Sequence, residues 1–252
     1  MFYRFFMLLS FFSVMLLANP HKSPVVVFAS ANNKFVFPKI IKSFNASNPN
    51  IKILVQYGAT GDLTNAILQG VEYDIFLAAD MDRPQKVYEA KKSITAPIKY
   101  AQGILILFVP ADKALDQKKL NILKEKKIKS LTIANARTAP YGKAAIEVLK
   151  NSGLYDVLSN KIKYSTDIST AITNVVWYDA AGFLSKSGIY SLPVGYKTQG
   201  VNWIEIDPSL YNPIEQGYVI SKRAIENRNA IKFLDFILSE KGQDIYKANG
   251  YK

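Results

Sequence analysis

The chain has 252 residues, of which 49% are hydrophobic and 21% charged, as expected for a globular protein with one large domain or two small lobes. It contains no cysteine, which excludes disulfides, thiolate catalysis and cysteine-ligated metals. The formal net charge of +12 is compatible with nucleic acid, an anionic membrane or small anions as partners. The lysines are spread along the chain, and their densest run, Lys118 to Lys129, is interleaved with apolar residues. That run predicts a solvated helix and turn with a half-buried face, so nucleic acid is not expected as a partner.

Residues 1–18 are predicted to be a secretory signal peptide. Arg4 supplies a positive charge, residues 5–17 are almost wholly apolar, and the small residue Ala18 follows. The apolar stretch is short for a membrane-spanning helix, and an uncleaved membrane anchor is the alternative. A lipid anchor is excluded because bacterial lipoprotein processing needs a cysteine. We therefore predict cleavage after Ala18 and an exported, soluble protein that is not a lipoprotein.

The mature chain opens with alternating strand and helix signals. Apolar, β-branched runs predict strands, and apolar residues at helical spacing predict the helices between them. The predicted strands cover residues 25–28, 51–56 and 75–78, and the predicted helices cover residues 37–44 and 62–70. Strands and helices that alternate at such short intervals are typical of a parallel sheet flanked by helices.

The same pattern begins again after residue 103. Residues 104–109 form an apolar run without polar alternation, which suits a buried central strand. Further strands are predicted at 131–134, 162–164, 180–184, 203–206 and 217–220, and helices at 143–151, 169–176 and 230–238, with a last helix through residue 246. We interpret the chain as two α/β lobes, with lobe 1 formed by residues 24–101 and 212–252 and lobe 2 (residues 102–211) inserted into it.

The sequence lacks the residue patterns of common enzymes. Its only histidine, His21, lies beside the predicted cleavage site, which argues against a Ser-His-Asp system or a histidine-based metal site. Neither a phosphate-binding glycine-lysine loop nor a dinucleotide-binding fingerprint occurs. Asp80 and Asp82 are among the closest pairs of carboxylates in the sequence, and we interpret them as part of a turn that follows a strand. We expect no enzymatic activity, and an exported hydrolase of anionic substrates is the alternative from a different class.

Four predicted strands end in small or polar residues, and a helix begins there at once. Two of these turns lie in each lobe, and they are Ala31-Asn32, Thr60-Gly61, Pro140-Tyr141-Gly142 and Asp167-Ile168-Ser169. A helix start has unpaired backbone N–H groups and a partial positive charge, so several that point to one place can bind an anion. Each turn alone fits ordinary helix capping, but a ligand held between two lobes needs donors from both.

These turns belong to segments that resemble a known protein family. The segments are Phe28-Ala29-Ser30-Ala31-Asn32, Tyr57-Gly58-Ala59-Thr60-Gly61, Asp74-Ile75-Phe76-Leu77-Ala78-Ala79-Asp80, Pro140-Tyr141-Gly142-Lys143-Ala144-Ala145, Asp167-Ile168 and Ala180-Ala181-Gly182-Phe183. In this order, from Pro24 to the end of the chain, they resemble the periplasmic molybdate-binding proteins of ABC transporters. The resemblance implies an α/β, two-lobed periplasmic-binding-protein fold of type II, in which each lobe is a mixed sheet flanked by helices. It also implies a periplasmic location, a membrane permease as partner, no cofactor, and molybdate or tungstate bound in the cleft between the lobes.

Carried over position by position, the resemblance implies ligand residues in lobe 1. Ala31 gives a backbone N–H, Asn32 occupies the place of a hydroxyl or amide ligand, and Thr60 occupies the second hydroxyl position. Asn32 in place of serine resembles a subgroup of the family. All of these groups bind the oxygens of the oxyanion, so no direct metal ligand is expected. One clamp around one anion needs no second copy, and we expect a monomer.

In lobe 2, Tyr141 and Ile168 fall at positions that contribute mainly backbone N–H groups. Many members of the family have a tyrosine ligand three residues after the glycine that is equivalent to Gly182. Here that position is Ser185, whose side chain reaches less far, and the subgroup with Asn32 likewise lacks the tyrosine. Ser185 is therefore the weakest member of the implied ligand set.

The chemistry of the anion explains why hydrogen-bond donors alone can bind it. Molybdate and tungstate are fully deprotonated near neutral pH, so an acceptor in the site would leave a buried group unpaired at a cost of roughly 1–3 kcal/mol. Phosphate carries a proton and gains from a carboxylate partner. Asp62 and Asp167 adjoin the predicted ligand residues, and we interpret both as helix-start residues that bond their own turns. Phosphate, sulfate or an organic acid is the alternative cargo.

Overall fold

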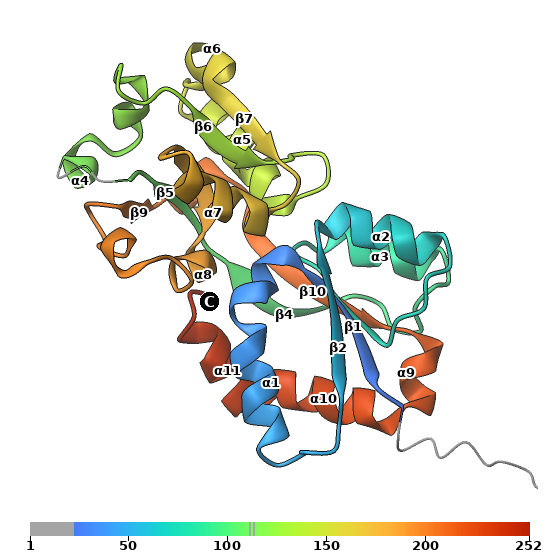
Figure 1. Ribbon diagram of the computed structural model, residues 1–252. Coiled ribbons are helices and arrows are strands. Elements are labelled where there is room, and N and C mark those ends of the chain that lie inside the picture. The colour runs from blue at the N-terminus through green and yellow to red at the C-terminus, as the bar shows by residue number, and fades with distance from the viewer. Residues whose placement is uncertain (1–22, 111, 113) are drawn as a thin grey trace, which may run out of the picture.

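Two five-stranded sheets form the centres of two lobes in the computed structural model, which describes residues 23–110, 112 and 114–252 (Figure 1). The predicted signal peptide and His21 lie outside the described residues. The strand order is β2-β1-β3-β10-β4 in the first sheet and β7-β6-β8-β5-β9 in the second. The two orders are equivalent, because three parallel strands in each sheet are followed by one strand that is antiparallel to both of its neighbours.

Lobe 1 is built from both ends of the described chain. Its strands are β1 (Val25–Ser30), β2 (Ile53–Gly58), β3 (Ile75–Leu77), β4 (Ile98–Gly103) and β10 (Ile214–Ile220), and its helices are α1 (Phe37–Asn45), α2 (Thr60–Leu68), α3 (Asp82–Glu89), α9 (Lys222–Glu226), α10 (Arg228–Leu238) and α11 (Glu240–Lys247). Side chains alternate between the two faces of a strand. Val25, Val27 and Ala29 therefore pack with α1 and α10, while Phe28 packs with α2 and α3 on the other face. Because helices cover both faces, β1 is apolar along nearly its whole length.

Lobe 2 repeats this plan. Its strands are β5 (Leu105–Phe108), β6 (Leu131–Ala134), β7 (Ile162–Ser165), β8 (Ala181–Ser185) and β9 (Trp203–Glu205), and its helices are α4 (Leu115–Lys118), α5 (Pro140–Asn151), α6 (Tyr155–Leu158), α7 (Ile168–Trp177) and α8 (Lys186–Ile189). All four residues of β5 are buried, and β5 lies between β8 and β9. The apolar run at 104–109 is therefore a central strand, as predicted.

The lobes are joined where β4 passes into β5 through Ile104 and where the chain returns from β9 to β10. The C-terminus also lies at this hinge. Tyr251 forms an antiparallel bridge with Gly103, and the backbones of Lys252 and Gln102 exchange hydrogen bonds of 2.9 and 3.1 Å. The lobe boundaries predicted after residues 101 and 211 lie inside β4 and shortly before β10.

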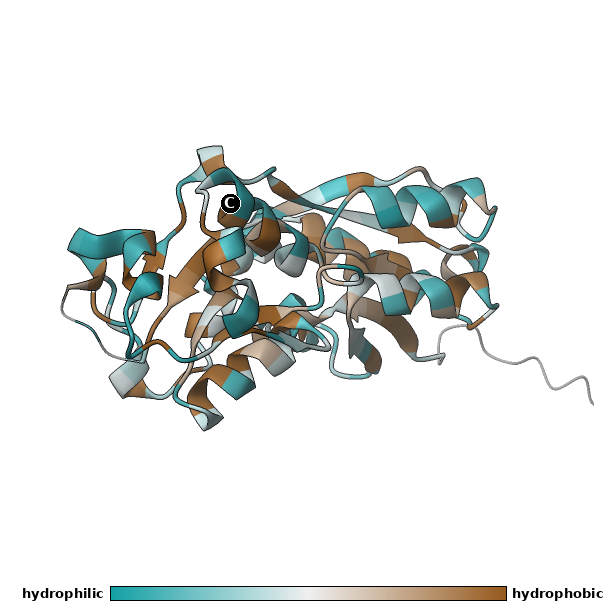
Figure 2. Ribbon diagram, turned by 90° about the horizontal axis from the view of Figure 1, so that it is seen from above, coloured by the Kyte–Doolittle hydropathy of each residue, from teal (hydrophilic) through white to brown (hydrophobic). Residues whose placement is uncertain are grey.

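Hydrophobic residues concentrate on the strands and on the helix faces turned toward them (Figure 2). The lysine-rich run forms the end of α4 and a 3-10 helix, Lys119–Lys124, with Ile122 and Leu123 fully buried, which confirms the predicted half-buried face. Helix α3 and strand β4 are elements that the sequence patterns did not predict. No helix within the described part of the chain is long and apolar enough to cross a membrane.

Candidate oxyanion-binding site

Four helices begin at the carboxyl ends of strands that face the boundary between the lobes. They are a 3-10 helix, η2 (Ala31–Phe35), which directly follows β1, and the α-helices α2, α5 and α7. The first-turn N–H groups of a helix have no acceptor within the helix. The N-cap residues of η2, α2 and α5 are Ser30, Ala59 and Ala139, and none of their side chains caps its helix. These helix starts therefore present backbone donors to whatever lies between the lobes.

The lobes meet at these helix starts. One continuous cluster of buried residues joins Ala31, Ala59 and Ala79 of lobe 1 to the core of lobe 2, where it includes Tyr141 and Ile168. Because these side chains are methyl groups on the lobe 1 side, the backbones of the two lobes can come close. Three of the six predicted ligand residues thus lie in one cluster across the boundary.

Two hydrogen bonds cross the mouth of the cleft. The N–H of Gly61, in the first turn of α2, donates to the carbonyl of Thr138 at 2.9 Å. The guanidinium of Arg83, which is paired with Asp80, donates to the carbonyl of Arg137 at 2.7 Å. A groove of about 450 Å³ is lined by residues of both lobes, among them Arg83 and Arg137. The structure therefore has the two lobes in contact across the cleft.

Thr60 has the geometry of a hydroxyl donor to a ligand. It is the first residue of α2 and its exposed fraction is 1%. Its Oγ1 accepts the N–H of Ala79 at 3.3 Å, and in the described part of the chain this hydroxyl acts only as an acceptor. The hydroxyl proton is thus left for an external acceptor.

Asn32 is fully buried, but its side-chain amide already has partners. Nδ2 donates to Oε1 of Gln216 at 3.0 Å and to the hydroxyl of Tyr251 at 2.9 Å, and Oδ1 accepts from Ser30 Oγ at 2.7 Å. Both amide hydrogens are used, so this side chain is not free to donate to an oxyanion, which differs from its implied role as an amide ligand. What Asn32 offers to the site is its backbone N–H in the first turn of η2.

Ser185 lies at the end of β8 and is fully buried. Its Oγ is 3.1 Å from Oγ of Ser187, which in turn lies 3.4 Å from the carbonyl oxygen of Asn32. The residue pairs with Leu105 at the start of β5, so it sits close to the hinge. A role of Ser185 as a ligand stays a prediction.

The carboxylates near the helix starts bond to their own turns or face solvent. Asp167 caps α7 by accepting the N–H of Thr170 at 2.9 Å and the hydroxyl of Ser169 at 2.8 Å, as predicted. Asp62 is exposed and, within the described residues, its carboxylate bonds nothing in its own turn, which differs from the prediction. Asp80 accepts the N–H of Arg83 at 3.0 Å, which confirms the turn after β3. No three carboxylate or histidine side chains among the described residues are grouped so as to hold a metal ion.

Burial keeps the nearby tyrosines protonated. Desolvation raises the pKa of Tyr141 and of Tyr251 well above the ordinary value. Both hydroxyls therefore remain neutral hydrogen-bond donors at physiological pH, and no phenolate repels an anion between the lobes.

Sequence reasoning missed Gln216, Tyr251 and Arg83. Gln216 is fully buried on β10, where it shares one face of the strand with Ile214 and Tyr218. A polar side chain on an otherwise apolar face of a strand was the available signal. Tyr251 and Arg83 contribute to the boundary between the lobes through contacts with residues that are distant in sequence, so no local sequence pattern could predict their roles.

Comparisons with known proteins agree with this architecture. The sequence profile of the bacterial extracellular solute-binding proteins matches residues 25–252. The molybdate-binding proteins ModA of Azotobacter vinelandii and Rhodobacter capsulatus are each 32% identical to the chain, over 94% of it and over 93% and 92% of their own lengths. The solved structure of the Azotobacter vinelandii periplasmic molybdate-binding protein superposes with a TM-score of 0.81 at 26% identity, covering 90% of this chain and 98% of that one. The resemblance and the two-lobed fold of type II predicted from the sequence are confirmed.

Proposed function

The chain belongs to the bacterial extracellular solute-binding proteins, and from this premise we propose that it captures molybdate or tungstate outside the cytoplasm for uptake by an ABC transporter. The observation that carries the proposal is the set of four helix starts at the boundary between the lobes, which come equally from lobe 1 and lobe 2. Such a site presents donors and no acceptor, as a fully deprotonated oxyanion requires.

The donors are backbone N–H groups and one hydroxyl. Ala31 and Asn32 supply N–H groups from η2, and Thr60 supplies its hydroxyl proton from α2. Tyr141 and Ile168 supply N–H groups from the first turns of α5 and α7. A hydrogen bond to a charged group contributes about 1.5–3 kcal/mol, so several of them offset the cost of removing the anion from water.

Binding favours the closed arrangement because the donors come from both lobes. An anion that bonds to lobe 1 alone gains only part of the hydrogen bonds, and closure completes the set. The ligand therefore shifts the population toward the closed form, and a membrane permease that prefers the closed form receives mainly loaded protein.

Selectivity follows from the absence of an acceptor at the helix starts. Hydrogen phosphate would point its proton at a donor, whereas Asp167 and Asp80 are engaged in their own turns and Asp62 is exposed. The resulting unpaired contact costs roughly 1–3 kcal/mol, which corresponds to about 5- to 150-fold weaker binding of phosphate than of molybdate. Sulfate is also fully deprotonated, so its discrimination depends on how well the closed site fits a smaller anion.

The role is binding rather than catalysis, and the location is the periplasm. The relatives are solute-binding proteins, and the donor set holds no general base or nucleophile beside a base. The protein works as a monomer with no cofactor, and its partners are the small oxyanion and the permease.

Calorimetric titration of the mature protein with molybdate, tungstate, sulfate and phosphate tests the proposal. We expect one-to-one binding of molybdate and tungstate that is tight, with phosphate and sulfate much weaker. A preference for phosphate would refute the donor-only site and point to a carboxylate that turns toward the anion. Absence of binding by all four anions would refute an oxyanion cargo altogether.

A further inference from the structure

Gln216 connects both lobes and the hinge through its single carboxamide. Its Oε1 accepts from Nδ2 of Asn32 at 3.0 Å and from the hydroxyl of Tyr100 at 2.9 Å. Its Nε2 donates to the hydroxyl of Tyr141 at 3.2 Å. Asn32 belongs to η2 of lobe 1, Tyr100 to the hinge strand β4, and Tyr141 to α5 of lobe 2. The bond to Tyr141 therefore crosses from one lobe to the other.

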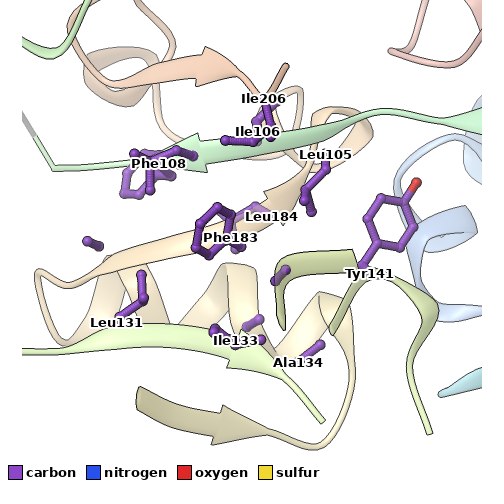
Figure 3. Packing of buried hydrophobic residues seen from close by; sticks show 14 of the residues in the cluster. Leu105, Ile106, Phe108, Leu131, Ile133, Ala134, Tyr141, Phe183, Leu184 and Ile206 are labelled. Carbon is purple, nitrogen blue, oxygen red and sulfur yellow. The ribbon is translucent and has the colours of Figure 1, made fainter. Parts of the chain in front are cut away.

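The side chain of Tyr141 is built to reach the hinge. Its ring packs on the core of lobe 2 while its hydroxyl points away from that core toward lobe 1 (Figure 3). The hydroxyl lies against Gly103, where a Cβ atom would come within 2.1 Å of it. A larger residue at position 103 would displace the tyrosine, so the absence of a side chain there makes room for the contact between the hydroxyl and Gln216.

The other side of the network fixes the first turn of η2. Asn32 uses both amide hydrogens and its Oδ1 within the protein, and the hydroxyl of Tyr251 also donates to the carbonyl of Asn32 at 3.0 Å. These bonds hold the peptide groups of η2 in a fixed orientation. The backbone donors of η2 thus depend on the same glutamine that bonds lobe 2.

We propose that Gln216 is a positioning residue that links closure of the lobes to assembly of the anion site. It orients the η2 donors through Asn32 and holds α5 in the closed position through the hydroxyl of Tyr141, without contact to the ligand. The inference rests on the proposed function where it is tested by the affinity for molybdate. Its conformational readout is independent of which anion the protein carries.

The network is buried, so removing all of it affects both the η2 turn and the contact between the lobes, and separate variants are needed to tell these effects apart. Gln216→Met keeps the size of the side chain and removes all three hydrogen bonds. Tyr141→Phe removes only the hydrogen bond between Gln216 and lobe 2 and keeps the backbone N–H of residue 141 in the site. Tyr73→Phe is the matched control, because the buried hydroxyl of Tyr73 donates to the carbonyl of Lys92 at 2.9 Å within lobe 1.

The first test is a double-mutant cycle on the dissociation constant of molybdate. Tyr141→Phe should raise Kd about tenfold, mainly through faster dissociation, since the closed form loses a contact that the open form lacks. In the Gln216→Met background the same change should alter Kd less than twofold, because the partner of the hydroxyl is already gone. Tyr73→Phe should leave Kd unchanged. Additive effects of Tyr141→Phe and Gln216→Met would overturn the coupling.

The second test measures the distance between the lobes without ligand. The chain has no cysteine, so Lys52→Cys in lobe 1 and Lys163→Cys in lobe 2, both at exposed positions, accept spin labels at two sites only. Pulsed electron-paramagnetic-resonance distances should move toward a longer, open population in Tyr141→Phe and Gln216→Met and stay unchanged in Tyr73→Phe. Identical distributions in all variants would overturn the inference. If the wild-type protein binds no molybdate, the proposed function fails and the distances still decide the role of Gln216.

Discussion

Gly61→Ala should weaken ligand binding without weakening either lobe. Gly61 lies in the first turn of α2, and a Cβ atom there would come within 3.1 Å of the Cα and 3.2 Å of the carbonyl oxygen of Thr138 in lobe 2. Ordinary contacts of a Cβ atom are 3.4–4 Å, so the lobes must move apart by a few tenths of an ångström. Overpacking of this kind costs about 1–3 kcal/mol, and here the cost falls on the closed form alone. The Kd of molybdate should rise by roughly 5- to 150-fold.

The stability of the ligand-free protein should change in the opposite direction or not at all. Alanine is better than glycine inside a helix by about 0.5–1 kcal/mol. In the open form the one close contact left to the new Cβ atom is Nε of Arg83 at 3.1 Å, which belongs to the end of a flexible side chain and can move aside. Calorimetric titration measures Kd, and thermal unfolding without ligand measures stability. Gly195→Ala is the control for binding, because no atom lies within 4 Å of its Cβ position and its Kd should match the wild type. An unchanged Kd in Gly61→Ala, whatever its Tm, would refute the account of closure.

Three further predictions concern the site and the core. Thr60→Val should raise the Kd of molybdate roughly 10- to 150-fold, because it removes a hydroxyl that donates to a charged group. Thr60→Ser keeps the hydroxyl, so its Kd should stay within a few-fold of the wild-type value. Equal effects of the two substitutions in calorimetric titrations would contradict the donor role. Arg223→Leu removes the ion-pair partner of Asp74, whose fully buried carboxylate lies 2.6 Å from the guanidinium. Denaturant unfolding should show that the free energy of unfolding falls by about 2–3 kcal/mol, while the Kd of molybdate stays unchanged. The loss is at the low end for buried pairs because Arg223 is partly exposed. Burial raises the pKa of Tyr141 and Tyr251 above 10.0, so the unfolded chain releases protons that the folded chain retains. Stability should therefore be complete below about pH 10 and fall above it. The difference in phenolate absorbance between the wild type and Tyr141→Phe, which isolates one buried hydroxyl, should rise together with the loss of circular dichroism rather than before it.

The alternation of strands and helices was predictable because most central strands here are buried on both faces. Residues 104–109 are a continuous apolar run, residues 131–134 are apolar except for Thr132, and the structure places β5 and β6 there. Strand β4 was missed because its burial pattern is exposed at the start and buried only toward Tyr100 and Gly103, which leaves no clear period. Helix α3, with the sequence DRPQKVYE, buries only Pro84 and Val87, so its apolar signal was too weak.

The helix starts at the site were predictable from local chemistry, whereas side-chain roles were not. Small residues after a strand mark a turn into a helix, and Ala31, Tyr141 and Ile168 do gather at one boundary. The partners of Asn32 come from residues 184 and 219 positions away, so no local pattern could show that its amide is already committed. These side-chain hydrogen bonds lie within lobe 1 and form only when its two separate chain segments come together.

The location of the metal atom in crystals of the mature protein grown with molybdate tests the central claim most directly. Anomalous scattering identifies molybdenum without assumptions about the surrounding atoms. We predict one peak between the lobes, with its oxygens within hydrogen-bonding distance of the N–H groups of η2, α5 and α7 and of Oγ1 of Thr60, and with no carboxylate among its neighbours. A peak in the groove beside Arg83 and Lys143, or a carboxylate oxygen in contact with the anion, would contradict the donor-only clamp.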